Sequence, residues 1–299
     1  MTQRRRVVAL CMVTAVVLSG GGGLGAVQVG MLAALADAGV TPDLVVGSSV
    51  GALNAAYIAG HPGPSGVAAL AAIWSGLRRD TVFATSPTRV LRAASGRVDS
   101  LADPRALRAL LAEHLGYERL EDAHCPLTVV ATEVMTGREV LLSAGSAVDA
   151  VMASAALPGV FPPVDVDDHL LMDGGVVNNT PISAARDLGA DLIYVLPTGY
   201  ACALATPPRS ALGMALHAVT VAIQRRLIED VRVLQHEVAL RVVPPLCPLN
   251  VGPADFRRTN TLIERARNAT VRWLARPLPA DQSRHLALHR HDLASRGSS

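Results

Sequence analysis

Short apolar runs alternate with longer helix-like segments along most of this chain. The runs with the composition of buried strands are Val13–Leu18, Leu44–Val46 and Asp191–Leu196. Segments in which apolar residues recur with helical spacing lie between them, at Gly25–Ala38, Ser49–Ala59 and Val67–Leu77. Because strands that alternate with helices favour parallel pairing, the pattern predicts an α/β fold with a mainly parallel sheet covered by helices.

The same alternation continues further along the chain. Residues 78–124 are more polar and rich in arginine, and we interpret them as an insertion beside the mouth of a candidate active site, with a helix at Ala106–Leu115. The other expected elements are a hairpin of Leu127–Val134 and Arg138–Leu142, a helix at Val148–Ala155, strands at His169–Met172 and Arg241–Val243, and helices at residues 210–240 and Thr259–Leu274.

The two ends of the chain differ from this pattern. Three arginines followed by the apolar run to Leu18 resemble the start of a signal peptide, but Val13–Leu18 is also the expected first core strand. We therefore expect residues 1–12 to be an N-terminal extension, with Met12 as an alternative translation start. Residues 13–276 are expected to form one domain, and residues 277–299 a frayed tail.

Composition narrows the classes of function. Half of the 299 residues are hydrophobic, 17% are charged, and the net charge of +2 is too small to indicate a nucleic-acid partner. No cluster of Asp, Glu or His predicts a metal ion. The four cysteines are scattered and indicate thiols in a reducing compartment, so we expect a cytoplasmic protein: Cys11, Cys125, Cys202 and Cys247.

A candidate nucleophile lies where the second strand is expected to turn into a helix. Gly47, Ser48, Ser49, Val50 and Gly51 form a Gly-x-Ser-x-Gly sequence directly after Leu44–Val46. A sharp strand-to-helix turn of this kind exposes the hydroxyl of its central serine, and its glycines avoid clashes across the bend. Ser49 is therefore the expected nucleophile.

A second loop offers hydrogen-bond donors for a negatively charged oxygen. It follows the first strand, precedes the first helix and consists of Gly20, Gly21, Gly22, Gly23, Leu24 and Gly25. Backbone N–H groups at a helix start, free of side chains, suit a tetrahedral oxyanion. We predict that this loop is an oxyanion hole.

The proton acceptor is expected at the end of a later strand. Asp173 follows Leu170–Met172 and precedes Gly174 and Gly175, and partial burial would raise its pKa toward that of a base. Among the nine histidines, His169 lies nearest to a motif.

In this order, the three motifs resemble those of the patatin-like phospholipase family. Further similarity lies in the segment Ala153–Pro163 before Asp173 and in Asn178–Pro181 after it. The resemblance covers about residues 13–197 and implies a three-layer α/β/α sandwich. It also implies a lipid acyl hydrolase with a Ser49–Asp173 dyad, which needs neither histidine nor a cofactor or metal.

The resemblance further implies a lipid or acyl-ester substrate and peripheral contact with a membrane. One departure is Leu24, which stands where the family often has Arg or Lys. The backbone donors would survive this change, whereas electrostatic attraction of an anionic headgroup would be lost.

Four other interpretations fit parts of the sequence. An acyltransferase would use the same acyl-enzyme, and a Ser-His-Asp α/β-hydrolase would need a histidine such as His169. A binding protein without turnover is disfavoured by the intact Ser49 and Asp173. Gly20, Gly22 and Gly25 also spell the dinucleotide-binding G-x-G-x-x-G pattern, but Asp43 precedes the second strand where the ribose-binding acid should follow it.

Overall fold

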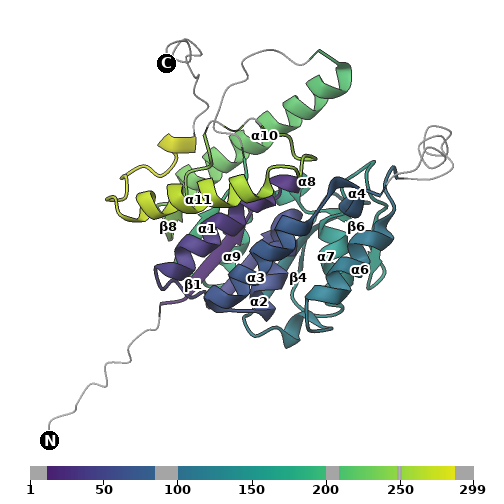
Figure 1. Ribbon diagram of the computed structural model, residues 1–299, viewed down its shortest axis with the longest axis horizontal. Coiled ribbons are helices and arrows are strands. Elements are labelled where there is room, and N and C mark those ends of the chain that lie inside the picture. Colours follow the sequence, from purple (N-terminus) through teal and green to yellow (C-terminus); the bar gives the residue numbers. More distant parts are fainter. Residues whose placement is uncertain (1–11, 85–99, 200–208, 248, 250, 287–299) are drawn as a thin grey trace, which may run out of the picture.

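The computed structural model contains a twisted sheet with helices on both of its faces (Figure 1). It describes residues 12–84, 100–199, 209–247, 249 and 251–286. In these ranges the sheet has eight strands in the order β5-β6-β3-β2-β1-β7-β8, with β4 also paired to β3. Four neighbouring pairs, β1–β2, β1–β7, β2–β3 and β7–β8, are parallel. The expected mainly parallel sheet is confirmed.

Alternate residues of the central strand serve two separate hydrophobic cores. On β1 (Thr14–Leu18), Val16 and Leu18 face a core with α1, α2, α3 and α11, whereas Ala15 and Val17 face a core with α9 and α10. Because side chains point to opposite faces with a period of two, a strand that is apolar throughout must be covered on both sides. The result is the expected three-layer α/β/α arrangement.

The elements expected before residue 160 are present close to their expected boundaries, and three short helices that were not expected, η1, α4 and η2, accompany them. They are η1 Gly22–Leu24, α1 Gly25–Asp37, β2 Leu44–Ser48, α2 Val50–Gly60, α3 Gly63–Gly76, α4 Arg79–Val82, α6 Pro104–His114, η2 Leu120–Asp122, β3 Leu127–Glu133, β4 Glu139–Leu142 and α7 Ala147–Ser154. Helix α3 starts earlier than expected, because a proline is tolerated in the first helical turn and Pro64 occupies it.

The later elements differ more from expectation. They are β5 Val164–Val166, β6 His169–Asp173, α8 Gly175–Asn178, α9 Ile182–Asp187, β7 Leu192–Leu196, α10 Ala211–Leu234, β8 Ala239–Val242, α11 Thr259–Leu274 and η3 Arg284–Leu286. The helix expected at 210–240 ends at Leu234, because Ala239 already pairs with Leu192 of β7. Strands β4, β5 and β6 are antiparallel to their neighbours.

Strands β2 and β6 meet end to end on one edge of β3, and this arrangement positions the site. Strand β2 pairs with Leu127–Val130 and β6 pairs with Ala131–Glu133, whereas β4 pairs across both stretches. Since β4 occupies one edge of β3, β2 and β6 must share the other. Strand β2 runs parallel to β3 and β6 runs antiparallel, so their carboxyl ends, Ser48 and Asp173, converge.

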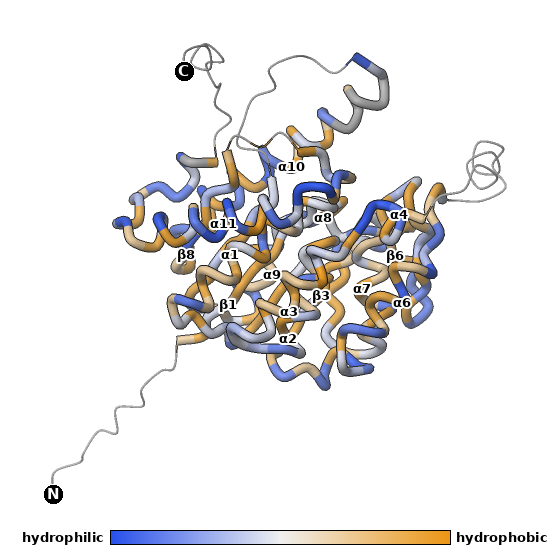
Figure 2. Tube along the Cα trace, viewed as in Figure 1, coloured by the Kyte–Doolittle hydropathy of each residue, from blue (hydrophilic) through white to orange (hydrophobic). Residues whose placement is uncertain are grey.

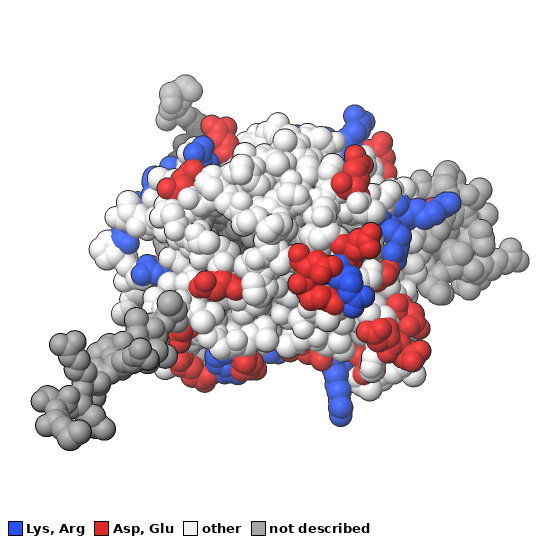
Figure 3. Space-filling view, turned by 90° about the horizontal axis from the view of Figure 1, so that it is seen from below, with Lys and Arg blue, Asp and Glu red and all other residues white. Residues whose placement is uncertain are grey.

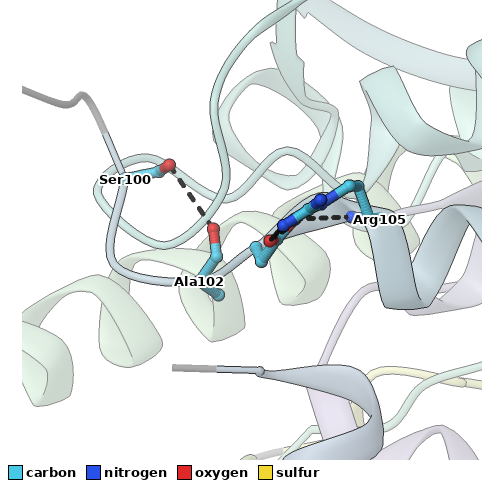
Figure 4. Close-up of polar contacts among 4 residues, drawn as sticks. Ser100, Ala102 and Arg105 are labelled. Atoms are coloured by element: carbon cyan, nitrogen blue, oxygen red, sulfur yellow. Dashed lines mark hydrogen bonds and ion pairs between the residues drawn. The ribbon is translucent and has the colours of Figure 1, made fainter. Parts of the chain in front are cut away.

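The described part of the 78–124 insertion packs beside the segment that precedes β5. Leu101 and Ala102 donate backbone hydrogen bonds to Gly159 and Val160. Asp103 caps the start of α6, because its side chain accepts from the backbone N–H of Arg105, and the Ser100 hydroxyl donates to Ala102 O at 3.5 Å (Figure 4). Residues 85–99 lie outside the described residues.

The chain remains packed beyond residue 277, where a frayed tail was expected. Gln282, Ser283 and Leu286 are buried, and Gln224 of α10 donates to Leu286 O at 2.5 Å. Residues 287–299 and the extension 1–11 lie outside the described residues. Among the helices of the described residues, none combines the length and the hydropathy that a membrane-spanning segment requires.

Candidate active site

Ser49 occupies the sharp turn between β2 and α2. Its φ of 55° and ψ of −127° are unusual for a residue with a side chain. Such conformations cost about 1–3 kcal/mol and persist only when neighbouring structure enforces them. The turn leaves Ser49 half-buried and places it directly before Val50, the first residue of α2, where the helix dipole favours negative charge.

A serine from another helix holds this turn in place. The hydroxyl of Ser154, at the end of α7, accepts a hydrogen bond from the Ser49 backbone N–H at 2.9 Å. The same hydroxyl donates to Val130 O of β3 at 2.5 Å. Ser154 thereby ties the strained residue to the central sheet, a role that residue spacing alone did not indicate.

Asp173 contacts Ser49 directly. The Ser49 hydroxyl donates to Asp173 Oδ2 at 2.7 Å, and the Gly175 backbone N–H donates to Asp173 Oδ1 at 2.7 Å. Asp173 is only 3% exposed, and burial raises its pKa to about 6, although both hydrogen bonds act in the opposite direction. The carboxylate is therefore a stronger base than an exposed one and remains ionised at neutral pH.

The acid loop reaches this position because Gly174 lacks a side chain. A Cβ atom at Gly174 would overlap Val130 O and would lie 2.8 Å from Ser48 Oγ. The backbone after β6 can therefore press against the end of β2 only if residue 174 is glycine.

The glycine-rich loop lies beside the same serine, although most of its amides are already engaged. A Cβ atom at Gly20 would stand 3.1 Å from the Ser49 Cβ atom. Within the loop and its described neighbours, Gly20 N donates to Asn179 O, Gly23 N to Pro253 O, Leu24 N to Gly21 O and Gly25 N to Gly22 O. Among the described residues, the amides of Gly21 and Gly22 have no acceptor, so these two amides remain as candidates for binding an oxyanion.

Leu24 has a structural place in this loop. Its side chain is 1% exposed and belongs to the core formed with α1, α2 and α3. The position where the family often has a cation therefore points into the protein here, so Leu24 contributes to the hydrophobic core.

A buried polar network fixes both ends of the glycine-rich loop. Gln28 of α1 donates to Ser19 O at 2.8 Å and to Leu196 O at 3.0 Å. Asn54 of α2 donates to Gly25 O and to the Gln28 side chain, and accepts from Trp74 Nε1 at 2.9 Å. Gln28 and Asn54 are polar residues in otherwise apolar stretches of their helices, a signal that could have identified them, since buried polar groups need partners.

Two other candidates from the sequence lie elsewhere. His169 starts β6, at the opposite end of the strand from Asp173, and its Nδ1 lies 2.9 Å from Glu133 Oε1. Asp43 precedes β2 and accepts from Thr14 N at 2.9 Å, so it is bound at the start of β1. Among the described residues, no three His, Cys, Asp or Glu side chains group together as metal ligands.

The architecture is that of an α/β/α protein with a serine and a buried carboxylate joined at the end of its parallel strands, beside a glycine-rich loop. The family model described as patatin-like phospholipase matches residues 16–186. The chain belongs to this family, as the motifs indicate.

Relatives of known name include patatin-like phospholipase domain-containing protein 7 of Rattus norvegicus, 30% identical over 187 residues, and neuropathy target esterase sws of Drosophila melanogaster, 31% identical over 185 residues. These matches cover 62% and 61% of this chain, but the chain spans only 13% of the length of either relative. Among solved structures, VipD from Legionella pneumophila has a TM-score of 0.45 at 17% identity, covering 88% of this chain and 67% of VipD.

Proposed function

We propose that this protein is a serine lipid acyl hydrolase with Ser49 as nucleophile and Asp173 as the base. The observation that carries the proposal is the 2.7 Å hydrogen bond from the Ser49 hydroxyl to the buried Asp173 carboxylate. A base must lie within hydrogen-bond reach of the proton it accepts, and its pKa should lie near the working pH. The Asp173 pKa of about 6 meets the second condition.

The geometry supports a two-step reaction. Ser49 Oγ attacks the ester carbonyl while its proton moves to Asp173 Oδ2, and the N–H groups of Gly21 and Gly22 stabilise the negative oxygen. Asp173 then gives this proton to the departing alcohol, which leaves an acyl group on Ser49. Water attacks the acyl-enzyme while one of its protons moves to Asp173, which then passes this proton to the departing Ser49 Oγ, and the fatty acid is released. Each oxyanion donor typically lowers such a barrier by about 3 kcal/mol.

The substrate class follows from family membership. The related proteins are named as phospholipase-domain proteins or as an esterase, so we assign an acyl ester of a lipid to this site. A membrane-borne lipid would be reached by peripheral contact. The cytoplasmic location that the cysteine pattern predicts is also part of the proposal. It is supported by Cys125, which is a free and buried thiol, and burial raises its pKa to about 11.

A fluorophosphonate probe tests the nucleophile. The wild-type protein should be labelled covalently and should hydrolyse p-nitrophenyl acyl esters, whereas Ser49→Ala should do neither and Asp173→Asn should lose ester turnover. Ser48→Ala is the matched control from the same turn. Ser48 is fully buried and its hydroxyl has no hydrogen-bond partner among the described residues, so this variant should keep both labelling and turnover. Labelling that persists in Ser49→Ala, or full turnover in Asp173→Asn, would refute the dyad.

A further inference from the structure

The first turns of α10 expose an unusual apolar surface. Met214 is 49% exposed and Val219 is 57% exposed, and Ala218 and Ala222 are exposed as well. In Figure 1 this end of α10 projects from the body of the molecule. From Met214 to Ile223, no residue with a described side chain is buried, whereas Gln224, Leu227, Val231 and Leu234 of the second half are.

The amino-acid sequence of these turns does not suit an exposed helix. Residues 211–223 contain no charged residue, and His217 and Thr220 are the sole polar ones. A helix that is apolar around its circumference is stable where an apolar environment surrounds it. These residues span only about 20 Å at 1.5 Å each, which is too short to cross a bilayer.

The charges around the apolar turns are positive. Arg209 precedes them and Arg225 follows them, both exposed, and the sequence contains no acidic residue between Asp191 and Glu229. Elsewhere, on the face seen in Figure 3, charges of both signs are scattered in small groups over a largely uncharged surface. Apolar residues bordered by arginines fit a lipid surface, where acyl chains lie beneath negatively charged phosphates.

The same helix joins the body of the protein next to the candidate active site. A Cβ atom at Gly199 would lie 3.2 Å from the side-chain oxygen of Gln224, where α10 becomes buried. One residue earlier, Thr198 donates from its backbone N–H to the Ser19 hydroxyl at 2.8 Å and from its own hydroxyl to Gly20 O. The apolar turns therefore extend from the segment that supports the glycine-rich loop.

We infer that the first turns of α10, represented by Met214, Ala218, Val219 and Ala222, insert into the surface of a lipid bilayer and dock the protein with its active site beside the membrane. In the body of the molecule, by contrast, hydrophobic residues run along the strands of the covered sheet (Figure 2). The helix lies in the interface and does not cross it. The inference rests on the proposed function for its biological purpose, while its physical basis is the exposed apolar helix.

Flotation with lipid vesicles tests the docking. The full chain carrying Ser49→Ala, which prevents hydrolysis, is mixed with vesicles of phosphatidylcholine and phosphatidylglycerol. This protein should float with the vesicles, and adding Val219→Glu or Met214→Glu should weaken binding by about tenfold or more, because a carboxylate would enter the apolar layer. The matched control is Val233→Glu, since Val233 is also 49% exposed but lies in the charged half of α10. Binding equal to that of the parent is expected for this control.

An activity measurement separates this inference from the proposed function. With Ser49 intact, Val219→Glu should hydrolyse water-soluble p-nitrophenyl butyrate at the wild-type rate and phosphatidylcholine in vesicles about tenfold more slowly. Val219→Glu that floats as well as Val233→Glu would overturn the docking. The docking would also be overturned if the wild-type protein formed a dimer without lipid and Val219→Glu converted this dimer to monomers, because a second copy of the chain would then cover the helix. An absence of ester hydrolysis in the wild type, with vesicle binding retained, would contradict the proposed function alone.

Discussion

At the scale of single residues, Asp173 combines a property that favours catalysis with one that reduces stability. Its carboxylate has two hydrogen bonds, yet burial still raises its pKa to about 6. An exposed aspartate has a pKa of about 4 and would be a much weaker base. The same burial makes the ionised form of Asp173 less favourable in the folded protein than in the unfolded chain.

The pH dependence of turnover follows from this pKa. In the proposed reaction Asp173 must be ionised to accept the proton of Ser49. The value of kcat/KM for a soluble ester should therefore be constant above about pH 7 and should fall about tenfold per pH unit below about 6. A steady-state pH profile measures this. A midpoint near the usual aspartate value, or a second essential group that titrates in the histidine range, would contradict the assignment.

Neutralising Asp173 should lower turnover but should raise the free energy of unfolding. Because the folded-state pKa is raised, the wild type loses stability as pH rises from about 4 through about 6, by about 1.4 kcal/mol per unit of pKa shift. Asp173→Asn removes this cost, so it should be more stable than the wild type at pH 7 by roughly 3 kcal/mol, with little difference at pH 4. Chemical denaturation at both pH values provides the measurement. A variant less stable than the wild type at pH 7 would show that burial does not dominate.

At the scale of elements, helices α1 and α2 orient the glycine-rich loop through their few polar residues. Gln28 binds the backbone at Ser19, before the loop, while Asn54 binds Gly25, after it. Helix α2 also begins beside Ser49, so the network links the proposed oxyanion donors to the proposed nucleophile through rigid helices. Displacement of such donors by about 1 Å can reduce a rate about a hundredfold.

Gln28→Met should therefore impair chemistry more than binding. The substitution keeps the length of the side chain and removes the bonds to Ser19 O and Leu196 O, so kcat for a soluble ester should fall about tenfold to a hundredfold while KM changes little. Gln282→Met is the matched control, because Gln282 is another buried glutamine, and its side chain bonds to Val242 N and Pro279 O instead of to the segments around the loop. Equal effects of both variants on kcat would mean that Gln28 has only a general structural role.

At the scale of the whole molecule, residues beyond the matched family segment complete the fold. Helix α11 packs along α1, and Arg267 forms an ion pair with Asp37 at 2.7 Å. Nearer the site, Pro253 O accepts from Gly23 N, and Phe256 stacks on Trp74 with ring centroids 6.1 Å apart. The C-terminal part thus holds the glycine-rich loop from outside, and we expect the chain to unfold as one cooperative unit.

Gly30→Val tests this integration. A Cβ atom at Gly30 would overlap Ile263 O and lie 2.8 Å from the Ala266 Cβ atom, so the larger side chain must separate α1 from α11. Overpacking of this kind typically costs about 1–3 kcal/mol, and for a cooperative unit of this size the single thermal transition should move to lower temperature by roughly 2–5 °C. In the control Gly76→Ala, the added methyl meets nothing within 4 Å, and Tm should be nearly unchanged. A separate low-temperature transition in Gly30→Val would indicate two independent units instead.

The amino-acid sequence alone was sufficient to predict the strands that are buried on both faces and the helices that are buried on one. Continuous apolar runs identified β1, β2 and β7, and helical spacing identified α11 at its observed limits, Thr259–Leu274. Small-residue motifs also pointed to Ser49, Asp173 and the glycine-rich loop, because sharp turns and exposed amides demand particular residue types. These are local requirements, and local sequence records them.

The tertiary structure alone decided which of these groups meet and which are already occupied. Ser49 and Asp173 touch because β2 and β6 end against each other on β3, a register that depends on pairing between distant segments. Pairing between distant segments also explains why the Gly23 amide is bonded to Pro253 O. It likewise explains why Ser154 holds the turn at Ser49 and Gln28 holds the start of the glycine-rich loop. Hydrogen bonds between residues far apart in the chain leave little local signal, so they emerge only when the sheet and its helices are assembled.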